Sequence, residues 1–117
     1  MADASDNLPP QLLDSLVRCR AQLGEIGVVL RGSIVERYMP CGKHGCRCQA
    51  QPPRLHGPYY QWTMKVDGKT KTVRLTPEDA QVYQGWIANG RRLNQVLAEW
   101  ENIGIQAARE IREKSRS

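Results

Sequence analysis

Residues 41–48 read Cys41-Gly42-Lys43-His44-Gly45-Cys46-Arg47-Cys48, and His56-Gly57-Pro58-Tyr59-Tyr60 follows soon after. Three of the four cysteines of the chain thus lie within eight residues, with a histidine close behind. The glycines let the backbone turn tightly between the thiols, as ligands that converge on one ion require. We interpret Cys41, Cys46 and Cys48 with one histidine as a tetrahedral zinc site, the alternatives being reduced thiols or a disulfide.

Two histidines compete to complete this site. Seven residues separate His56 from Cys48, whereas His44 lies inside the short loop between Cys41 and Cys46, where another ligand would be crowded. We therefore expect His56 to be the fourth ligand and keep His44 as the alternative.

The size and composition of the chain fit one small domain. Its 117 residues support a modest core that a metal ion would help to stabilise. The sequence shows neither an apolar leader nor an apolar run of ~18 residues, so we expect a cytoplasmic protein without a membrane segment. In a reducing cytoplasm, clustered cysteines are more often metal ligands than disulfides.

Positive charge is concentrated in the cysteine-bearing middle of the chain. Residues 31–76 contain nine basic side chains and two acidic ones, whereas the flanking segments are acidic or balanced. This excess predicts a polyanionic partner, the alternative being a solvated basic surface. Basic side chains would meet phosphates and aromatic ones would stack on bases, and the candidate nucleic-acid contacts are Arg37, Lys43, Arg47, Arg54, Tyr60, Trp62, Lys65, Lys69, Lys71 and Arg74.

The sequence before the cysteines predicts a disordered tail over residues 1–7 and a helix over residues 8–31. Apolar residues recur at alternating spacings of three and four, as in a helix that packs on another helix. They are Leu12, Leu16, Cys19, Leu23, Ile26 and Leu30. On this stripe Cys19 is expected to be a small buried hydrophobe. Gly24 and Gly27 weaken the last turns, and Gly32 is expected to end the helix.

Around the cysteines, short β-branched and aromatic runs predict three strands, over residues 33–39, 59–66 and 69–75. Asp67-Gly68 is a strong signal for a two-residue hairpin turn between the last two. We expect Val66, Val73 and Leu75 to face inward, and Lys69, Lys71, Arg74 and, on the partner strand, Lys65 to form a basic side. The sheet would then be half buried and half basic.

Thr76-Pro77-Glu78-Asp79 predicts the start of a long helix over residues 77–114. Its main apolar stripe runs through Leu93, Leu97 and Trp100, widened by Ile87, Val96 and Ile103, and Asn89-Gly90 is a point where the helix could break. The stripe predicts pairing with the first helix as an antiparallel helical hairpin. The expected fold class is α+β, with one zinc-stabilised domain over residues 8–114 made of helix 8–31, zinc knuckle and β-hairpin 33–76, and helix 77–114.

The order Cys-Gly-Lys-x-Gly-Cys-x-Cys, His-Gly-Pro-Tyr-Tyr and Asp-Gly-Lys-Thr resembles that of a family of small bacterial proteins of unknown function, over roughly residues 30–100. In this motif His44 occupies the variable position, which favours His56 as ligand, and the resemblance implies a link to mobile elements. Residues 59–86 are also similar to the arm-type DNA-binding module of phage integrases, in which two strands joined by a Gly-Lys hairpin precede a helix. No recombinase catalytic domain follows, so this second likeness implies DNA contact alone.

The function that these patterns predict is a zinc-stabilised nucleic-acid-binding accessory protein, with DNA favoured over RNA. The alternative is an assembly module that forms a homodimer or docks on a larger protein through its helical hairpin, with zinc purely structural. We do not expect an enzyme, because three thiolates and a histidine close a zinc site, Cys-x-x-Cys is absent, and Glu36 and Asp67 are the only acids of residues 31–76.

Overall fold

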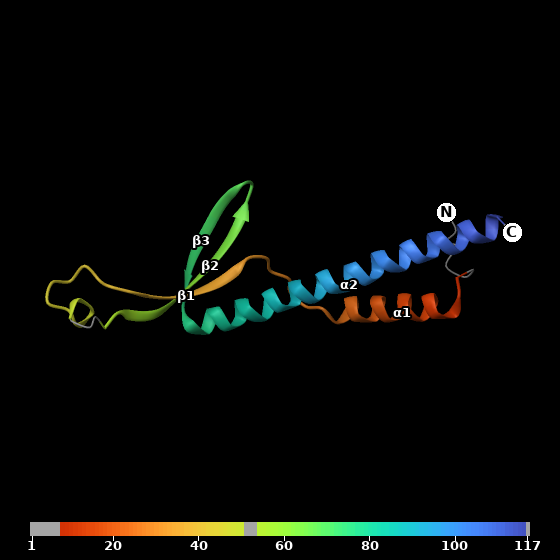
Figure 1. Ribbon diagram of the computed structural model, residues 1–117. Helices are drawn as coiled ribbons and strands as arrows, with labels where there is room; N and C mark the ends of the chain where they lie inside the picture. Colours follow the sequence, from red (N-terminus) through yellow and green to blue (C-terminus); the bar gives the residue numbers. More distant parts are fainter. Residues whose placement is uncertain (1–7, 51–53, 117) are drawn as a thin grey trace. The chain divides into compact units, whose positions relative to one another are not determined.

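The computed structural model describes residues 8–50 and 54–116, and it has the predicted α+β architecture (Figure 1). The elements in chain order are α1 (Pro10–Glu25), β1 (Ser33–Met39), the short 3₁₀ helix η2 (Arg47–Gln49), β2 (His56–Val66), β3 (Lys69–Leu75) and α2 (Pro77–Arg116). The predicted disordered tail of residues 1–7 lies outside the described residues. Within the described ranges, no helix is both long enough and apolar enough to cross a membrane.

The chain divides into two compact units. One comprises residues 1–29 and 89–117, with α1 and the later part of α2, and the other comprises residues 30–88, with the sheet, the cysteine loop and the start of α2. The single domain over residues 8–114 stays a prediction.

The first unit is a pair of helices that lie side by side (Figure 1). Its core is formed by Cys19, Val96 and Ile103, which are buried, with Ile26 and Trp100 packed against them. Cys19 is 1% exposed and points its thiol at the carboxylate of Glu99, at 3.8 Å. The prediction that Cys19 is a buried residue of the helical stripe is therefore confirmed.

Two details of the predicted helices are wrong. Helix α1 ends at Glu25 rather than residue 31, and the chain is extended at Ile26, since Gly24 and the β-branched residues beyond it favour non-helical backbone. In α2 the buried residues include Ile87, Val96 and Ile103, which were expected only to widen the apolar stripe. Leu97, which was expected on the main stripe, is 41% exposed. The helix continues without a break through Gly90, which is itself buried.

The second unit contains a three-stranded antiparallel sheet in the order β1-β2-β3. Strand β3 has the predicted bounds, and β2 begins three residues earlier than expected, at His56. The turn between β2 and β3 is formed by Asp67 and Gly68, both with positive φ, as a two-residue hairpin of this type requires. Central strand β2 therefore pairs with β1 in its first part and with β3 in its second part, and it has a partner on each side over residues 60–63.

The register assigns each residue to one face of the sheet. Trp62 is paired with Ile34 on β1 and Val73 on β3, and its ring meets the edge of Tyr83 in α2 at 5.9 Å between centroids. The face of Trp62 is therefore the face that contacts α2. We call the opposite side, where Arg37, Gln61 and Arg74 lie, the open face.

The expected split of the sheet into an inward apolar side and an outward basic side is wrong in part. Every second residue of β3 points to the same side of the sheet. Lys69, Lys71, Val73 and Leu75 form one such series, so all four belong to the face of Trp62. Arg74 and Lys65 belong to the open face, because they are paired in register with Gln61 and Thr70. Basic side chains therefore occur on both faces, although α2 meets only one of them at the Trp62–Tyr83 contact.

Candidate metal centre and nucleic-acid interface

The candidate metal centre lies where β1 ends and β2 begins. Met39 on β1 is paired with His56 on β2, so the chain leaves the sheet and returns to it at neighbouring points. Cys41 follows β1 directly after Pro40, and His56 is the first residue of β2. The antiparallel pairing therefore brings together the first and last of the predicted ligands, although fifteen positions separate them in the sequence.

Short turns place the other two thiols. The N–H of Cys46 donates to the carbonyl of Lys43 at 3.4 Å, and Gly45 has a φ of +79°, which favours glycine. Cys48 lies within η2 and is 2% exposed. The N–H of Arg54 then donates to the carbonyl of Arg47 at 3.1 Å, which returns the chain toward β2.

The ligand atoms of Cys41, Cys46, Cys48 and His56 all lie within 4.8 Å of one another. The Sγ atoms of Cys41 and Cys48 are 3.6 Å apart, and the Sγ of Cys46 is 3.0 Å from Nε2 of His56. A tetrahedral ion with metal–sulfur bonds of about 2.3 Å places its sulfurs about 3.8 Å apart. These four residues are therefore close enough together to hold one four-coordinate metal ion.

The other histidine is not part of this group. His44 is exposed and lies outside the cluster that the four ligand residues form. The structure thus brings His56, and not His44, to the three thiols, and the assignment of His56 as the metal ligand stays a prediction. The four residues are close enough together to hold a metal ion.

The thiols of the centre differ in acidity. The backbone N–H of Cys48, followed by hydrogen bonds to His56 and Cys41, lowers the pKa of Cys46 to about 6. The backbone N–H of Lys43 lowers the pKa of Cys41, but burial and the nearby sulfurs of Cys46 and Cys48 outweigh it, and the pKa is raised. A metal ion that binds here displaces any remaining thiol protons, since the thiolate is the ligand.

Gly57 fixes the strand beside the histidine ligand. Its φ is +146°, and a Cβ atom there would lie 2.7 Å from the carbonyl oxygen of Arg37 and 2.9 Å from the ring of Tyr38. The register of β1 and β2 shifts between Arg37 and Met39, opposite this point, and the Gly57–Pro58 peptide bond is cis. The glycine of His-Gly-Pro-Tyr-Tyr is thus required for close approach of the two strands at the metal centre.

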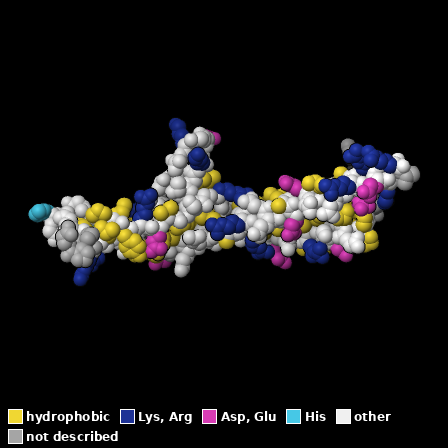
Figure 2. All heavy atoms as spheres, viewed as in Figure 1, with side chains coloured by type: hydrophobic (Ala, Val, Ile, Leu, Met, Phe, Trp, Pro, Cys, Tyr) yellow, Lys and Arg dark blue, Asp and Glu magenta, His cyan; other side chains and the backbone are white. Residues whose placement is uncertain are grey.

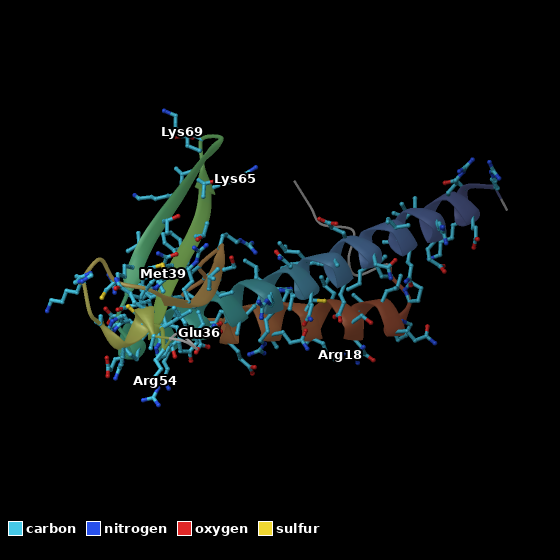
Figure 3. All side chains as sticks on the ribbon, turned by 60° about the vertical axis from the view of Figure 1, so that its left-hand side comes forward. Arg18, Glu36, Met39, Arg54, Lys65 and Lys69 are labelled. Atoms are coloured by element: carbon cyan, nitrogen blue, oxygen red, sulfur yellow. The ribbon has the colours of Figure 1, made fainter. Side chains whose placement is uncertain are left out.

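The ten candidate nucleic-acid residues do not form one patch. Figure 3 shows Lys65 and Lys69 at the tip of the β2–β3 hairpin and Arg54 at the opposite end of the unit, near the cysteine loop. On the side visible in Figure 2, Lys and Arg side chains lie along the projecting hairpin. Lys43, Arg47 and Arg54 are exposed and belong to the cysteine loop. The remaining basic candidates are distributed over the two faces of the sheet.

The aromatic candidates are engaged within the protein. The indole N–H of Trp62 donates to the carbonyl of Arg31 at 2.8 Å, and its ring contacts Tyr83, which in turn stacks on Trp86. Tyr60 lies on the same face as Trp62 and is half-buried. Base stacking by Tyr60 and Trp62 stays a prediction, and the contacts that Trp62 makes with Arg31 and Tyr83 are those of a packing residue.

One contact on the open face, between Arg74 and Tyr59, was not predicted from the sequence. The guanidinium of Arg74 lies 4.0 Å from the centroid of the Tyr59 ring, a cation–π contact on the open face. The sequence offered a signal for it, because the hairpin turn at Asp67-Gly68 fixes the register and puts Arg74 opposite Gln61, next to Tyr59 on the same face.

The comparison with protein families gives one match, to a domain of unknown function, DUF6788, over residues 8–84. No curated protein and no solved structure matches the chain. The matched residues include α1, the whole sheet, the four ligands and the start of α2, which is about two thirds of the sequence. The chain therefore belongs to the family defined by this domain of unknown function, DUF6788.

Proposed function

We propose that this protein is a zinc-stabilised nucleic-acid-binding accessory protein whose partner is DNA. The observation that carries the proposal is the concentration of charge on the metal-bearing unit. The segment of residues 31–76, which includes the whole sheet and all four ligands, contains nine basic side chains and two acidic ones. A localised positive field of this kind attracts the phosphate backbone of nucleic acids.

Zinc is the proposed metal because of the donor set. Three thiolates and one imidazole are soft and borderline ligands, which suit zinc, and their spacing fits tetrahedral coordination. With four protein ligands no position stays open for a water molecule or a substrate. We therefore propose a structural role for the ion, which ties the end of β1 to the start of β2, and a binding role without catalysis for the protein. The resemblance to proteins linked to mobile elements agrees with a DNA partner.

A second candidate function is self-association through the helices. The observation that favours it is the exposure of large apolar side chains on the two-helix unit, where Val17, Ile105 and Ile111 are 62%, 54% and 54% exposed. A homodimer would cover such residues. In this case zinc would still stabilise the sheet, and the protein would be an assembly module.

The two candidates are separated by measuring binding and size on the same purified full-length protein. Zinc content is measured by elemental analysis, nucleic-acid binding by fluorescence anisotropy at low and high salt, and mass by light scattering with size-exclusion chromatography. The proposal expects about one zinc per chain and salt-dependent binding to DNA. Folded, zinc-loaded protein that binds no nucleic acid at low salt would exclude the first candidate, and a concentration-independent monomer would exclude the second.

A further inference from the structure

We propose that the open face of the three-stranded sheet is the surface that contacts nucleic acid, and that its partner is duplex DNA entered through the major groove. This inference rests on the proposed nucleic-acid function. It adds the surface that makes the contact and the form of the nucleic acid. It also narrows the ten candidate residues to a small group led by Arg37, Lys65 and Arg74.

The first argument is the charge of the open face. The register places Arg37, Lys65 and Arg74 on this face, together with the polar Gln61, Thr63 and Thr72. Neither acid of residues 31–76 is among them. Glu36 is paired with Tyr60 and so belongs to the other face, where it accepts a hydrogen bond from the hydroxyl of Tyr38 at 3.0 Å, and Asp67 is in the hairpin turn.

The second argument is that these cations are available. Arg37, Lys65 and Arg74 are exposed, and within the part of the chain that the structure describes none of them forms an ion pair. The guanidinium of the exposed Arg74 lies 4.0 Å from the centroid of the Tyr59 ring, and a cation–π contact of this kind does not require any of its N–H hydrogen-bond donors. A guanidinium that is positioned in this way loses less side-chain entropy when it binds a phosphate or a base edge.

The third argument concerns which face is free. The other face carries Trp62, whose ring contacts Tyr83 of α2 and whose N–H is bound to the carbonyl of Arg31. It also carries the half-buried Val73 and Leu75. A partner that approached that face in the neighbourhood of Trp62 would meet the helix. The open face presents the polar and basic side chains of all three strands.

The form of the nucleic acid follows from the shape and chemistry of this face. Proteins that bind single strands offer aromatic rings on which bases stack. On the open face the ring is Tyr59, and Arg74 already covers it. The sheet is three strands wide only around residues 60–63, where a strand spacing of ~4.8 Å gives a backbone width of about 10 Å, and the hairpin that carries Lys65 is two strands wide. Both widths fit the major groove of B-DNA, about 12 Å wide. The major groove of duplex RNA is too deep and narrow for such a sheet.

The test compares two double variants that each remove two positive charges from the same hairpin. Lys65→Gln with Arg74→Gln alters the open face, and Lys69→Gln with Lys71→Gln alters the other face. Each full-length, zinc-loaded protein is titrated by fluorescence anisotropy against duplex DNA, duplex RNA and single-stranded DNA at several salt concentrations. Zinc content and thermal unfolding of each variant show that it remains folded.

We expect the open-face variant to bind duplex DNA at least about tenfold more weakly, with a salt slope smaller by about 1.8, since each phosphate contact contributes about 0.9. The affinity of the Lys69→Gln, Lys71→Gln variant for duplex DNA should fall by at most about threefold. Equal losses in the two variants, or a larger loss for Lys69 and Lys71, would overturn the face assignment and leave the nucleic-acid function standing. Tighter binding of the wild type to single strands or to RNA would overturn the duplex DNA assignment. No binding by the wild type to any of the three would remove the proposed function and this inference with it.

Discussion

The imidazole Nε2 of His56 lies 3.0 Å from the Sγ of Cys46, and His56 is also the first residue of β2. One residue thus contributes both to the ligand cluster and to the pairing of the central strand with β1. Because these two roles share one backbone position, we expect metal binding and strand pairing to stabilise each other.

Removal of the histidine ligand should release the metal. We expect His56→Ala to lose most of its zinc and to unfold at a lower temperature, whereas His44→Ala should keep about one zinc per chain, because His44 is exposed and outside the ligand cluster. Elemental analysis after dialysis against a weak chelator measures the difference. Zinc lost from the His44 variant and kept by the His56 variant would show that the wrong histidine had been assigned.

In the metal-free protein, alkylation should modify Cys46 first and Cys41 later, and it should leave Cys19 unmodified. The pKa of Cys46 is lowered to about 6, so its reactive thiolate forms as the pH rises through that value, whereas Cys41, whose pKa is raised, requires a more alkaline solution. Cys19 is 1% exposed and should stay unmodified while the fold is intact. Alkylation with iodoacetamide between about pH 5 and 8, followed by peptide mass spectrometry, reports the order.

Zinc is the control for that experiment. The metal-loaded protein should be protected at Cys41, Cys46 and Cys48 alike, since a coordinated thiolate is a poor nucleophile. Modification of Cys41 ahead of Cys46 in the metal-free protein would contradict the assigned acidities. Equal rates with and without zinc would contradict the ligand set.

Gly57→Ala should weaken metal binding without changing any ligand. A Cβ atom at this position would press on the carbonyl of Arg37, and φ is +146°, so strain of about 1–3 kcal/mol is expected at the β1–β2 pairing. We expect zinc affinity, measured by competition with a chromophoric chelator, to fall by about tenfold. Gly42→Ala is the matched control, because a Cβ atom at Gly42 has nothing within 4 Å. Equal affinities of the two variants would show that the strand tolerates the side chain.

The helix pair should depend on the buried line of α2. Ile103 is 7% exposed and packs with Cys19 and Val96, so Ile103→Ala should lower the free energy of unfolding by about 2–5 kcal/mol. Leu97→Ala should cost less than about 1 kcal/mol, because Leu97 is 41% exposed. Chemical denaturation of the full chain, followed by circular dichroism, measures both. A larger loss for Leu97 would indicate that a second copy covers it.

Local signals in the sequence were enough to predict the hairpin and the ligand cluster. Asp67-Gly68 favours one tight turn, so β3 has the expected bounds. The close spacing of the thiols between Pro40 and His56 is typical of a metal-binding loop, and the structure brings these side chains together. Each of these features depends on residues that are close in the chain. The spacing of the glycines reinforced the same interpretation.

Features that depend on tertiary packing were predicted less well. The three-and-four spacing of α2 fits a line through Leu97 as well as one through Val96, and only the partner helix decides which is buried. The position at which α1 ends depends on how strongly Gly24 and Gly27 destabilise the helix, which the sequence pattern alone does not give. Alternation along the hairpin divides its residues between two faces, but only the contact between Trp62 and Tyr83 shows which face meets α2.

The sheet order leaves β1 and β3 with one neighbour each, so both are edge strands. Unprotected edges can pair with strands of other molecules and start aggregation, and proteins often prevent this with charged side chains, lysine above all. Lys69 and Lys71 lie along the β3 edge and are exposed, which suits them to keep molecules apart in solution. Their contribution would then appear as solubility, visible as increased light scattering of the Lys69→Gln, Lys71→Gln variant at high protein concentration.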